Sequence, residues 1–235
     1  MRIAYRVTRP EDVGRWEGDF AQLSVYRHWE GSLPGAWECV RLLKEQGIRY
    51  VIHPVGYSVA AGGDQEKAVM ELAEVADLGI ILHDERSPGG GRLSGEREER
   101  FRRMIGELSK RTAVSFENAN DTGDAPWFWE RFAESVTLDI GHVEGAGFDS
   151  VKYVSELPAA VVEKIDYVHM HHNNGLRGGL TDHWPLREGC REMKALEALL
   201  GRRDGFDAIL EINELDEVNE SIRMLRALWS RLKGE

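Results

Sequence analysis

Short apolar segments rich in β-branched residues alternate with longer amphipathic segments along the whole chain, and this alternation restricts the fold most. Strands are expected at residues 3–7, 20–25, 49–53, 79–83, 113–117, 136–139, 167–171 and 208–211. Helices are expected at residues 10–16, 32–46, 64–76, 94–109, 125–132, 150–163, 187–200 and 216–232. Segments such as IRYVIH and GIILH are apolar on both faces, which is typical of parallel strands covered by helices.

The alternation predicts an α/β protein with a (β/α)8 TIM barrel, formed by residues 1–235 as a single domain. A length of 235 residues suits one such barrel. An open, doubly wound sheet is the structural alternative. No GxGxxG or GxxxxGK[ST] motif follows an expected strand, so the usual nucleotide-binding signals of such sheets are missing from the sequence. The closed barrel is therefore favoured.

Charge and cysteine content narrow the function classes. The chain has 30 Lys and Arg against 41 Asp and Glu, a net charge of -11, which disfavours binding to nucleic acid or to an anionic membrane. Its two cysteines, Cys39 and Cys190, provide neither a disulfide framework nor a cysteine-rich zinc module. The sequence MRIAYRV has no signal-peptide pattern, and no apolar run approaches the roughly 20 residues that span a bilayer. A cytoplasmic protein is expected.

Ionisable side chains stand at the ends of six successive expected strands. In a parallel barrel these ends lie on one face, where active sites form. Carboxylates and imidazoles packed together are costly unless a cation neutralises them. The sequence therefore predicts a metal site there. The side chains concerned are His53, His83, Glu117, Asp139, His169, His171 and Glu211.

Carboxylate oxygens and imidazole nitrogens without thiolates suit Mn²⁺, Zn²⁺, Co²⁺ or Mg²⁺, and the imidazoles favour the first three ions over Mg²⁺. We expect a divalent ion as the cofactor. Two glutamates, one aspartate and one histidine would leave coordination positions open for vicinal oxygens of a substrate.

At these residues the sequence resembles the xylose isomerase-like barrel superfamily, which holds sugar isomerases and epimerases together with endonuclease IV-type AP endonucleases. The segments VSFENAN, LDIGH, VHMHHNNG, DHWPLREG and LEIN carry the resemblance in this order, and it covers roughly residues 51–213. It implies that Glu117, Asp139, His169 and Glu211 are the shared metal ligands. In the isomerases and epimerases, the positions of Glu117 and Glu211 also act as acid and base.

The resemblance implies further roles for histidines. His142 matches a residue that binds substrate in the epimerases and an additional metal in the endonucleases. His53 and His83 match two residues that hold a second metal with Glu117 in the endonucleases, and His183 matches a ligand of a third.

The sequence departs from the superfamily pattern at two places. Thr181 stands where the endonucleases have an acidic ligand of the third metal, although Asp182 is adjacent. His172 replaces an aspartate in the HxHD-like stretch, so His171 and His172 are candidates for contacts with substrate, with the ligands or with solvent. The residues expected to bind substrate are His142, His171, Trp184 and Arg177.

The first functional hypothesis is a sugar or sugar-phosphate isomerase or epimerase. One glutamate removes a proton next to a carbonyl, a second group returns it, and the metal stabilises the enediolate oxygens. Trp127, Trp129 and Trp184 are expected in loops on the same face, where they could stack on a sugar. The alternative is that they cover the top of the barrel or pack under helices. The expected partner is a small-molecule sugar or sugar phosphate.

The second hypothesis is an endonuclease IV-like, multi-metal phosphodiesterase acting on abasic DNA or another phosphoester. The four additional histidines favour it, and the net charge of -11 disfavours it. The segment ERSPGGGRLSGEREER has arginines and glycines that could cradle a phosphate, but its glutamates offset the charge. A phosphorylated sugar would satisfy the same loop.

A third hypothesis is a barrel that keeps a metal site but only binds a ligand or partner. Apolar residues of the last expected helix, among them Met224, Leu225, Leu228 and Trp229, suit core packing or contact with a second copy, so a homo-oligomer stays open.

Overall fold

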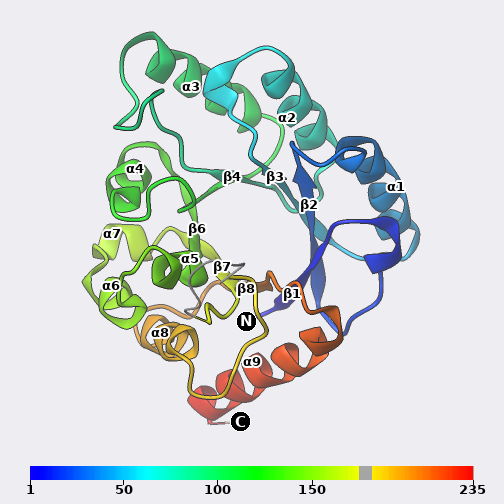
Figure 1. Cartoon of the computed structure of the whole chain (residues 1–235), viewed down its shortest axis with the longest axis vertical. Helices are drawn as coiled ribbons and strands as arrows, with labels where there is room; N and C mark the ends of the chain where they lie inside the picture. Colours follow the sequence, from blue (N-terminus) through cyan, green and yellow to red (C-terminus); the bar gives the residue numbers. More distant parts are fainter. Residues whose placement is uncertain (175–181, 235) are drawn as a thin grey trace.

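The structure is a computed structural model that describes residues 1–174 and 182–234. Eight parallel strands close into a barrel in chain order, with β8 paired to β1 (Figure 1). The predicted (β/α)8 TIM barrel is thereby confirmed. The strands are β1 (Ile3–Val7), β2 (Phe20–Tyr26), β3 (Tyr50–Val55), β4 (Ile80–His83), β5 (Val114–Glu117), β6 (Ser135–Asp139), β7 (Ile165–Met170) and β8 (Asp207–Leu210).

Helices form a ring outside the strands (Figure 1). They are α1 (Ser32–Glu45), α2 (Asp64–Val75), α3 (Gly95–Leu108), α4 (Ala125–Phe132), α5 (Ile140–Gly145), α6 (Ser150–Glu156), α7 (Ala159–Val162), α8 (Arg191–Leu200) and α9 (Val218–Lys233). Three short 3-10 helices lie at η1 (Pro10–Asp12), η2 (Val59–Ala61) and η3 (Leu215–Glu217). No helix in the described residues is both long and apolar enough to span a membrane.

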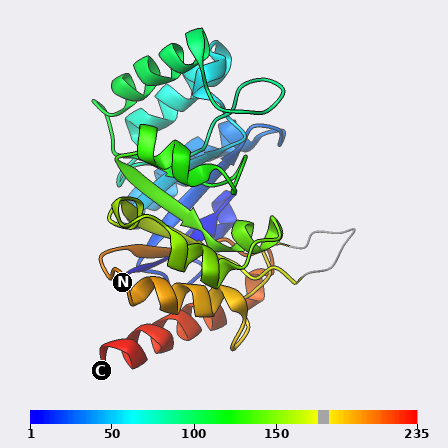
Figure 2. The same ribbon diagram turned by 90° about the vertical axis from the view of Figure 1, so that its left-hand side faces the viewer.

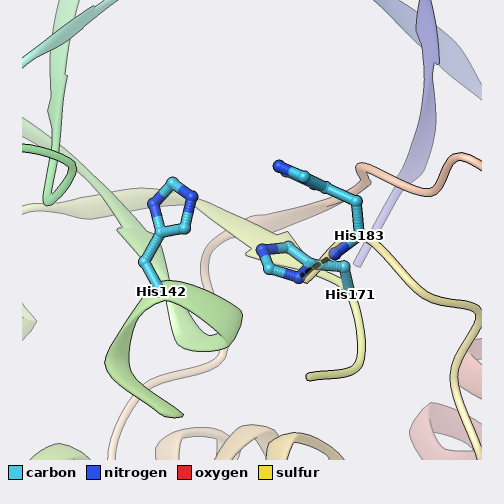
Figure 3. A group of neighbouring side chains, drawn as sticks. All are labelled: His142, His171 and His183. Carbon is cyan, nitrogen blue, oxygen red and sulfur yellow. Dashed lines mark hydrogen bonds between the residues drawn. The ribbon is translucent and has the colours of Figure 1, made fainter. Parts of the chain in front are cut away.

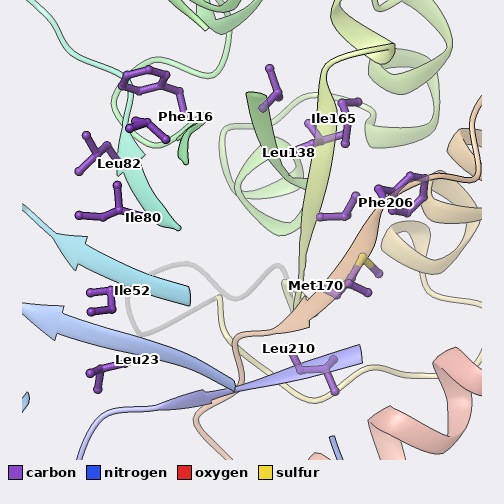
Figure 4. Packing of buried hydrophobic residues seen from close by; sticks show 14 of the residues in the cluster. Leu23, Ile52, Ile80, Leu82, Phe116, Leu138, Ile165, Met170, Phe206 and Leu210 are labelled. Atoms are coloured by element: carbon purple, nitrogen blue, oxygen red, sulfur yellow. The ribbon is translucent and has the colours of Figure 1, made fainter. Parts of the chain in front are cut away.

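The outward faces of the strands form the main core. Successive side chains of a strand point to opposite sides, so every second residue faces the helices. Leu23, Ile52, Leu82 and Phe116 are buried between strands and helices in this way (Figure 4). In α9, Leu225 and Leu228 join the same core, as the pattern of this helix predicted.

The inward faces carry a second, smaller apolar cluster: Ala4, Phe20, Val51, Ile81 and Ile209. Moving two residues along a strand towards its carboxyl end leads to the next inward position. That step leads from Val51 to His53, from Ile81 to His83 and from Ile209 to Glu211. The carboxyl end of the barrel, called the barrel mouth below, is therefore lined with polar side chains above an apolar floor.

Two helical segments differ from the prediction. The expected helix at residues 150–163 is divided into α6 and α7, because Leu157 precedes Pro158 and is pushed into an extended conformation, with ψ 135. The expected helix at residues 10–16 is only the short η1. In addition, α5 was not predicted, and it places His142 at the barrel mouth.

Candidate metal centre at the barrel mouth

The four side chains predicted to share a metal lie together. The Nδ1 atom of His169 is 3.5 Å from Glu117 Oε1, 3.7 Å from Asp139 Oδ2 and 4.0 Å from Glu211 Oε1. All four residues are buried. Ligand atoms that are each about 2.0–2.3 Å from a common ion lie roughly 3–4 Å from one another. The distances from His169 are in this range. Asp139, His169 and Glu211 form one group whose ligand atoms all lie within 4.8 Å of one another, and Glu117 forms another with His53 and His169.

Strand register produces this convergence. Asp139 of β6 is the register partner of His169 of β7, and His83 of β4 is the partner of Glu117 of β5. Asp139 also begins α5, where its carboxylate accepts a hydrogen bond from the backbone of His142 at 2.7 Å. Residues about thirty positions apart along the chain thus meet as neighbours in the barrel.

Glu117 faces histidines on its other side. Its Oε2 atom is 3.0 Å from His53 Nε2 and 3.6 Å from His83 Nε2, and the two Nε2 atoms are 3.3 Å apart. The Nδ1 atom of His53 is 2.9 Å from the carbonyl oxygen of Ile81, a contact in which Nδ1 must donate. In the neutral ring, His53 therefore presents a lone pair at Nε2 to the carboxylate. A cation bound by both groups would make this contact favourable.

Buried polar atoms that lack hydrogen-bond partners show whether the side chains of this centre suit a metal ion. Among the described residues, both carboxylate oxygens of Glu117 and the Nδ1 atom of His169 are buried without a hydrogen bond. Burial of such atoms without compensation is costly. A divalent cation held by Glu117, Asp139, His169 and Glu211 would compensate them, and oxygen and imidazole ligands match such an ion. The residues fit the metal that the sequence predicted.

Gln22, on β2, holds two of these side chains and was missed by sequence analysis. Its Oε1 atom lies 2.7 Å from His169 Nε2, and its Nε2 atom donates to Glu211 and, at 3.1 Å, to Ser24 Oγ. Because a carboxylate only accepts, the amide NH₂ must face Glu211. Its oxygen then accepts the hydrogen of His169 Nε2. This leaves the Nδ1 lone pair of His169 directed at the carboxylates, as metal binding requires.

The carboxylates and imidazoles of the centre shift each other's pKa values towards the charged forms. Burial alone would raise the pKa of Glu117, but His169 and His53 hold this pKa well below its usual value. In the same way, His169 and His183 lower the pKa of Glu211 to about 2 against the effect of burial. Burial opposes protonation of His169, yet Glu211 and Glu117 raise its pKa well above 6.5. Without a metal, a protonated imidazole therefore neutralises part of the carboxylate charge.

His142, His171 and His183 face one another beside this centre (Figure 3). The Nδ1 atom of His171 accepts a hydrogen bond of 2.9 Å from the backbone of His183, so its Nε2 carries the hydrogen and faces Asp139 Oδ1 at 3.1 Å. Both nitrogens of His171 are thus engaged. The ring of His171 is buried and contacts Asp139, and its expected contact with substrate stays a prediction.

His142 and His183 are closer to open space. His142 Nδ1 is 3.2 Å from Glu117 Oε1 and 3.4 Å from Asp139 Oδ2. These two carboxylates overcome the effect of burial and raise the pKa of His142 to about 10. His183 donates from Nδ1 to the carbonyl oxygen of Glu211 at 2.8 Å. Its φ of 57 is the only positive value at a non-glycine position in the described part of the chain, which marks a locally strained backbone.

The remaining predicted residues lie as follows. Arg177 and Thr181 are outside the described residues. Trp184 pairs through its backbone with His172, with hydrogen bonds of 2.8 and 3.1 Å.

The expectation that Trp127 and Trp129 lie in loops at the barrel mouth is wrong. Both belong to α4, where Trp129 is fully buried and donates to the carbonyl oxygen of Phe116 at 2.9 Å.

Comparison with protein-family models finds no match, and comparison with curated proteins also finds none. Solved structures share the fold. A D-tagatose 3-epimerase-like protein has a TM-score of 0.71 at 15% identity, with 100% of this chain and 99% of the other covered. The D-psicose 3-epimerase from Clostridium cellulolyticum H10, solved with D-tagatose, has a TM-score of 0.59 at 10% identity, with 97% and 99% covered.

Phosphoribosyl anthranilate isomerase from Thermotoga maritima also shares the barrel, with a TM-score of 0.53 at 13% identity and coverage of 97% and 99%. Identities at this level establish the fold alone, because one barrel fold carries many reactions. These structures confirm the barrel fold that the resemblance implied.

Proposed function

We propose that this chain, as one domain of residues 1–235, is a divalent-metal-dependent isomerase or epimerase of a sugar or sugar phosphate. One observation carries the proposal: Glu117 and Glu211 each have a carboxylate oxygen within 4.0 Å of His169 Nδ1, and both are buried with a lowered pKa. An ionised carboxylate at this centre can take a proton from a substrate carbon, and the second carboxylate can return a proton once it has itself taken one up from solvent. The fold similarity to a D-psicose 3-epimerase and to a D-tagatose 3-epimerase-like protein supports the same reaction class.

Glu211 is assigned as the base because Gln22 holds its carboxylate in place. Gln22 fixes its Oε1 atom, whereas none of the described residues donates a hydrogen bond to Oε2. That oxygen can therefore take a proton from the carbon next to the carbonyl. Glu117 would return a proton from the opposite side, or Glu211 itself would return it to the neighbouring atom. His142, with its raised pKa, can donate a hydrogen bond to a substrate oxygen at this site.

Glu117, Asp139, His169 and Glu211 would hold the metal, and their ligand atoms favour Mn²⁺, Zn²⁺ or Co²⁺ over Mg²⁺. When bound, this ion would stabilise negative charge on the substrate oxygens as the proton leaves. The floor of apolar side chains below the centre limits the entry of water from within the barrel.

Solvent exchange tests the proposed reaction. Metal-loaded protein is incubated in D₂O with a panel of ketoses, aldoses and their phosphates, and NMR follows deuterium at the carbon next to the carbonyl. We expect exchange with at least one sugar, and a loss of about 10²-fold or more in Glu117→Gln and Glu211→Gln. Glu214→Gln, at an exposed site three residues beyond Glu211, is the matched control and should retain the wild-type rate. Exchange that persists in Glu211→Gln contradicts the assignment of the base.

A multi-metal phosphoester hydrolase is the second candidate, and one observation favours it. His53 and His83 direct Nε2 atoms at the Oε2 atom of Glu117, opposite the oxygen that faces His169. This arrangement offers a second cation position bridged by Glu117. Elemental analysis of the purified protein separates the candidates. One ion per chain supports the isomerase or epimerase, whereas two or three ions with cleavage of a phosphodiester support the hydrolase.

A further inference from the structure

A cavity of about 370 Å³ lies beside the metal centre at the barrel mouth. Loops that follow three neighbouring strands, β3, β4 and β5, form its wall. The polar residues of the lining include Ser58, His83, Arg86, Arg97 and Asn120. Its volume falls within the range of about 300–1,000 Å³ that is typical of small-molecule sites.

The cavity is continuous with the centre through His83. This residue lines the cavity, and its Nε2 atom is 3.6 Å from Glu117 Oε2. A substrate bound at the centre can therefore extend past His83 into the cavity.

Two guanidinium groups give the lining its chemical character. Arg86 is only 11% exposed, held by Asp121 at 3.1 Å and Asp124 at 2.9 Å. Arg97 donates from Nε to the carbonyl oxygen of Arg86 and from Nη2 to Ser58 Oγ, each at 3.1 Å. Within residues 1–174 and 182–234, the Nη1 atom of Arg97 makes no hydrogen bond. These contacts fix the orientation of the Arg97 guanidinium group and leave its Nη1 atom available to a ligand.

Glu85 is the acidic residue of the lining, and its charge is already compensated. Its carboxylate accepts hydrogen bonds from Ser58 Oγ at 2.7 Å, Val59 N at 2.6 Å and Ala60 N at 3.2 Å. It also lies 3.6 Å from Arg97. Arg86 is likewise paired with Asp121 and Asp124, so Arg97, through its Nη1 atom, is the guanidinium group of the lining that remains for an anion.

We propose that this cavity binds an anionic group, phosphate or carboxylate, at the end of the sugar remote from the reacting carbonyl. A fixed guanidinium fork binds such groups through paired, charge-assisted hydrogen bonds. Asn120, in the loop that follows β5, adds a side-chain amide to the lining. The inference rests on the proposed function and deepens it, because it selects sugar phosphates or sugar acids over neutral sugars as substrates.

The test measures anion binding without turnover. Full-length protein is treated with EDTA, dialysed, and titrated calorimetrically with inorganic phosphate and, separately, with gluconate. We expect wild type to bind at least one of them, and Arg97→Gln to weaken that binding at least tenfold. Arg97→Lys, which keeps the charge but loses the fork, should fall between them. Arg100→Gln is the matched control, since Arg100 is nearby, contacts the carbonyl oxygen of Ala61 at 3.3 Å and does not line the cavity.

The two anions distinguish a phosphate site from a carboxylate site. Absence of binding by wild type, or equal binding by wild type and Arg97→Gln, overturns the anion site. Exchange of α-hydrogens on neutral sugars together with no anion binding overturns the anion site alone. Anion binding that depends on Arg97, with no exchange on any sugar, overturns the proposed function and leaves the anion site standing.

Discussion

The side-chain amide of Gln22 joins β2 to ligands from β7 and β8. Replacing it with leucine keeps the approximate size but removes both the acceptor for His169 and the donor for Glu211. The His169 ring can then rotate, or carry its hydrogen on Nδ1 instead of Nε2, and Nδ1 is no longer held ready to bind the metal. We expect Gln22→Leu to bind Mn²⁺ or Zn²⁺ about 10–100-fold more weakly, as other losses of a ligand's hydrogen-bond partner do. Isothermal titration calorimetry measures this change.

Ser24→Ala is the control for Gln22→Leu. Ser24 contacts the same amide nitrogen at 3.1 Å but none of the ligands by hydrogen bond in the described residues, so a smaller loss of affinity is expected. Equal metal affinity in wild type and in a folded Gln22→Leu protein would show that the amide does not orient His169.

Metal binding should release protons. The raised pKa of His169 means that its imidazole is protonated at pH 7 in the metal-free protein, whereas a ligand imidazole must be neutral. Affinity therefore rises with pH below the pKa of His169, roughly tenfold per pH unit for each proton released. Calorimetry in two buffers of different ionisation enthalpy counts these protons. A heat that is independent of the buffer would contradict the prediction.

Sequence analysis could identify the charged members of the centre, since Glu117, Asp139 and Glu211 each end an apolar strand. Gln22 lacked such a signal. It is a neutral residue within β2, and its contact with His169 bridges 147 positions of the chain. Only barrel closure brings the two together. The engagement of both His171 nitrogens was equally hidden, because the backbone of His183 supplies one partner.

Among the helices, α5 couples the centre to its surroundings most closely. A Cβ atom at Gly141 would lie 2.1 Å from Cε1 of His171, a fully buried ring. Gly141→Ala must displace this ring from Asp139. We expect a loss of about 1–3 kcal/mol in the free energy of unfolding, as for other overpacked sites. Urea denaturation measures it.

Gly106→Ala in α3 is the contrasting change. A Cβ there meets nothing within 4 Å, so alanine should stabilise the helix by about 0.5–1 kcal/mol. If both alanine variants shifted the urea midpoint alike, the packing of His171 on Gly141 would not be the cause.

At this scale the expected strands match the observed ones closely, because apolar runs of strand length bounded by glycine or polar residues are distinctive. The helix that the sequence did not predict, α5, has six residues, two of them glycine, and is too short to show a helical period. The division of α6 from α7 could have been predicted from Pro158. The burial of Trp129 also agrees with the helical spacing of Ala125, Phe128 and Trp129 in α4.

For the whole molecule, the proposed ligands tie together β5, β6, β7 and β8, one half of the closed barrel. A cation held by all four strands binds the folded state alone. We expect free metal at a hundred times its Kd to stabilise the protein by about 2.7 kcal/mol, and EDTA to remove this gain. Thermal unfolding with and without metal tests it. Asp139→Asn is the control and should lose most of the response, whereas an unchanged melting temperature in wild type would argue against a site built across these strands.

Because neighbouring residues of each strand face opposite sides, the reactive lining and the supporting wall can be redesigned separately. In β5, Phe116 packs against the helices while Glu117 faces the mouth, and in β3 Ile52 and His53 divide in the same way. Exchanging inward residues would leave the outer packing untouched. Inserting a single residue in a strand would instead turn an entire row of side chains to the wrong side. The barrel is thus a scaffold that tolerates new chemistry by substitution but resists changes in strand length.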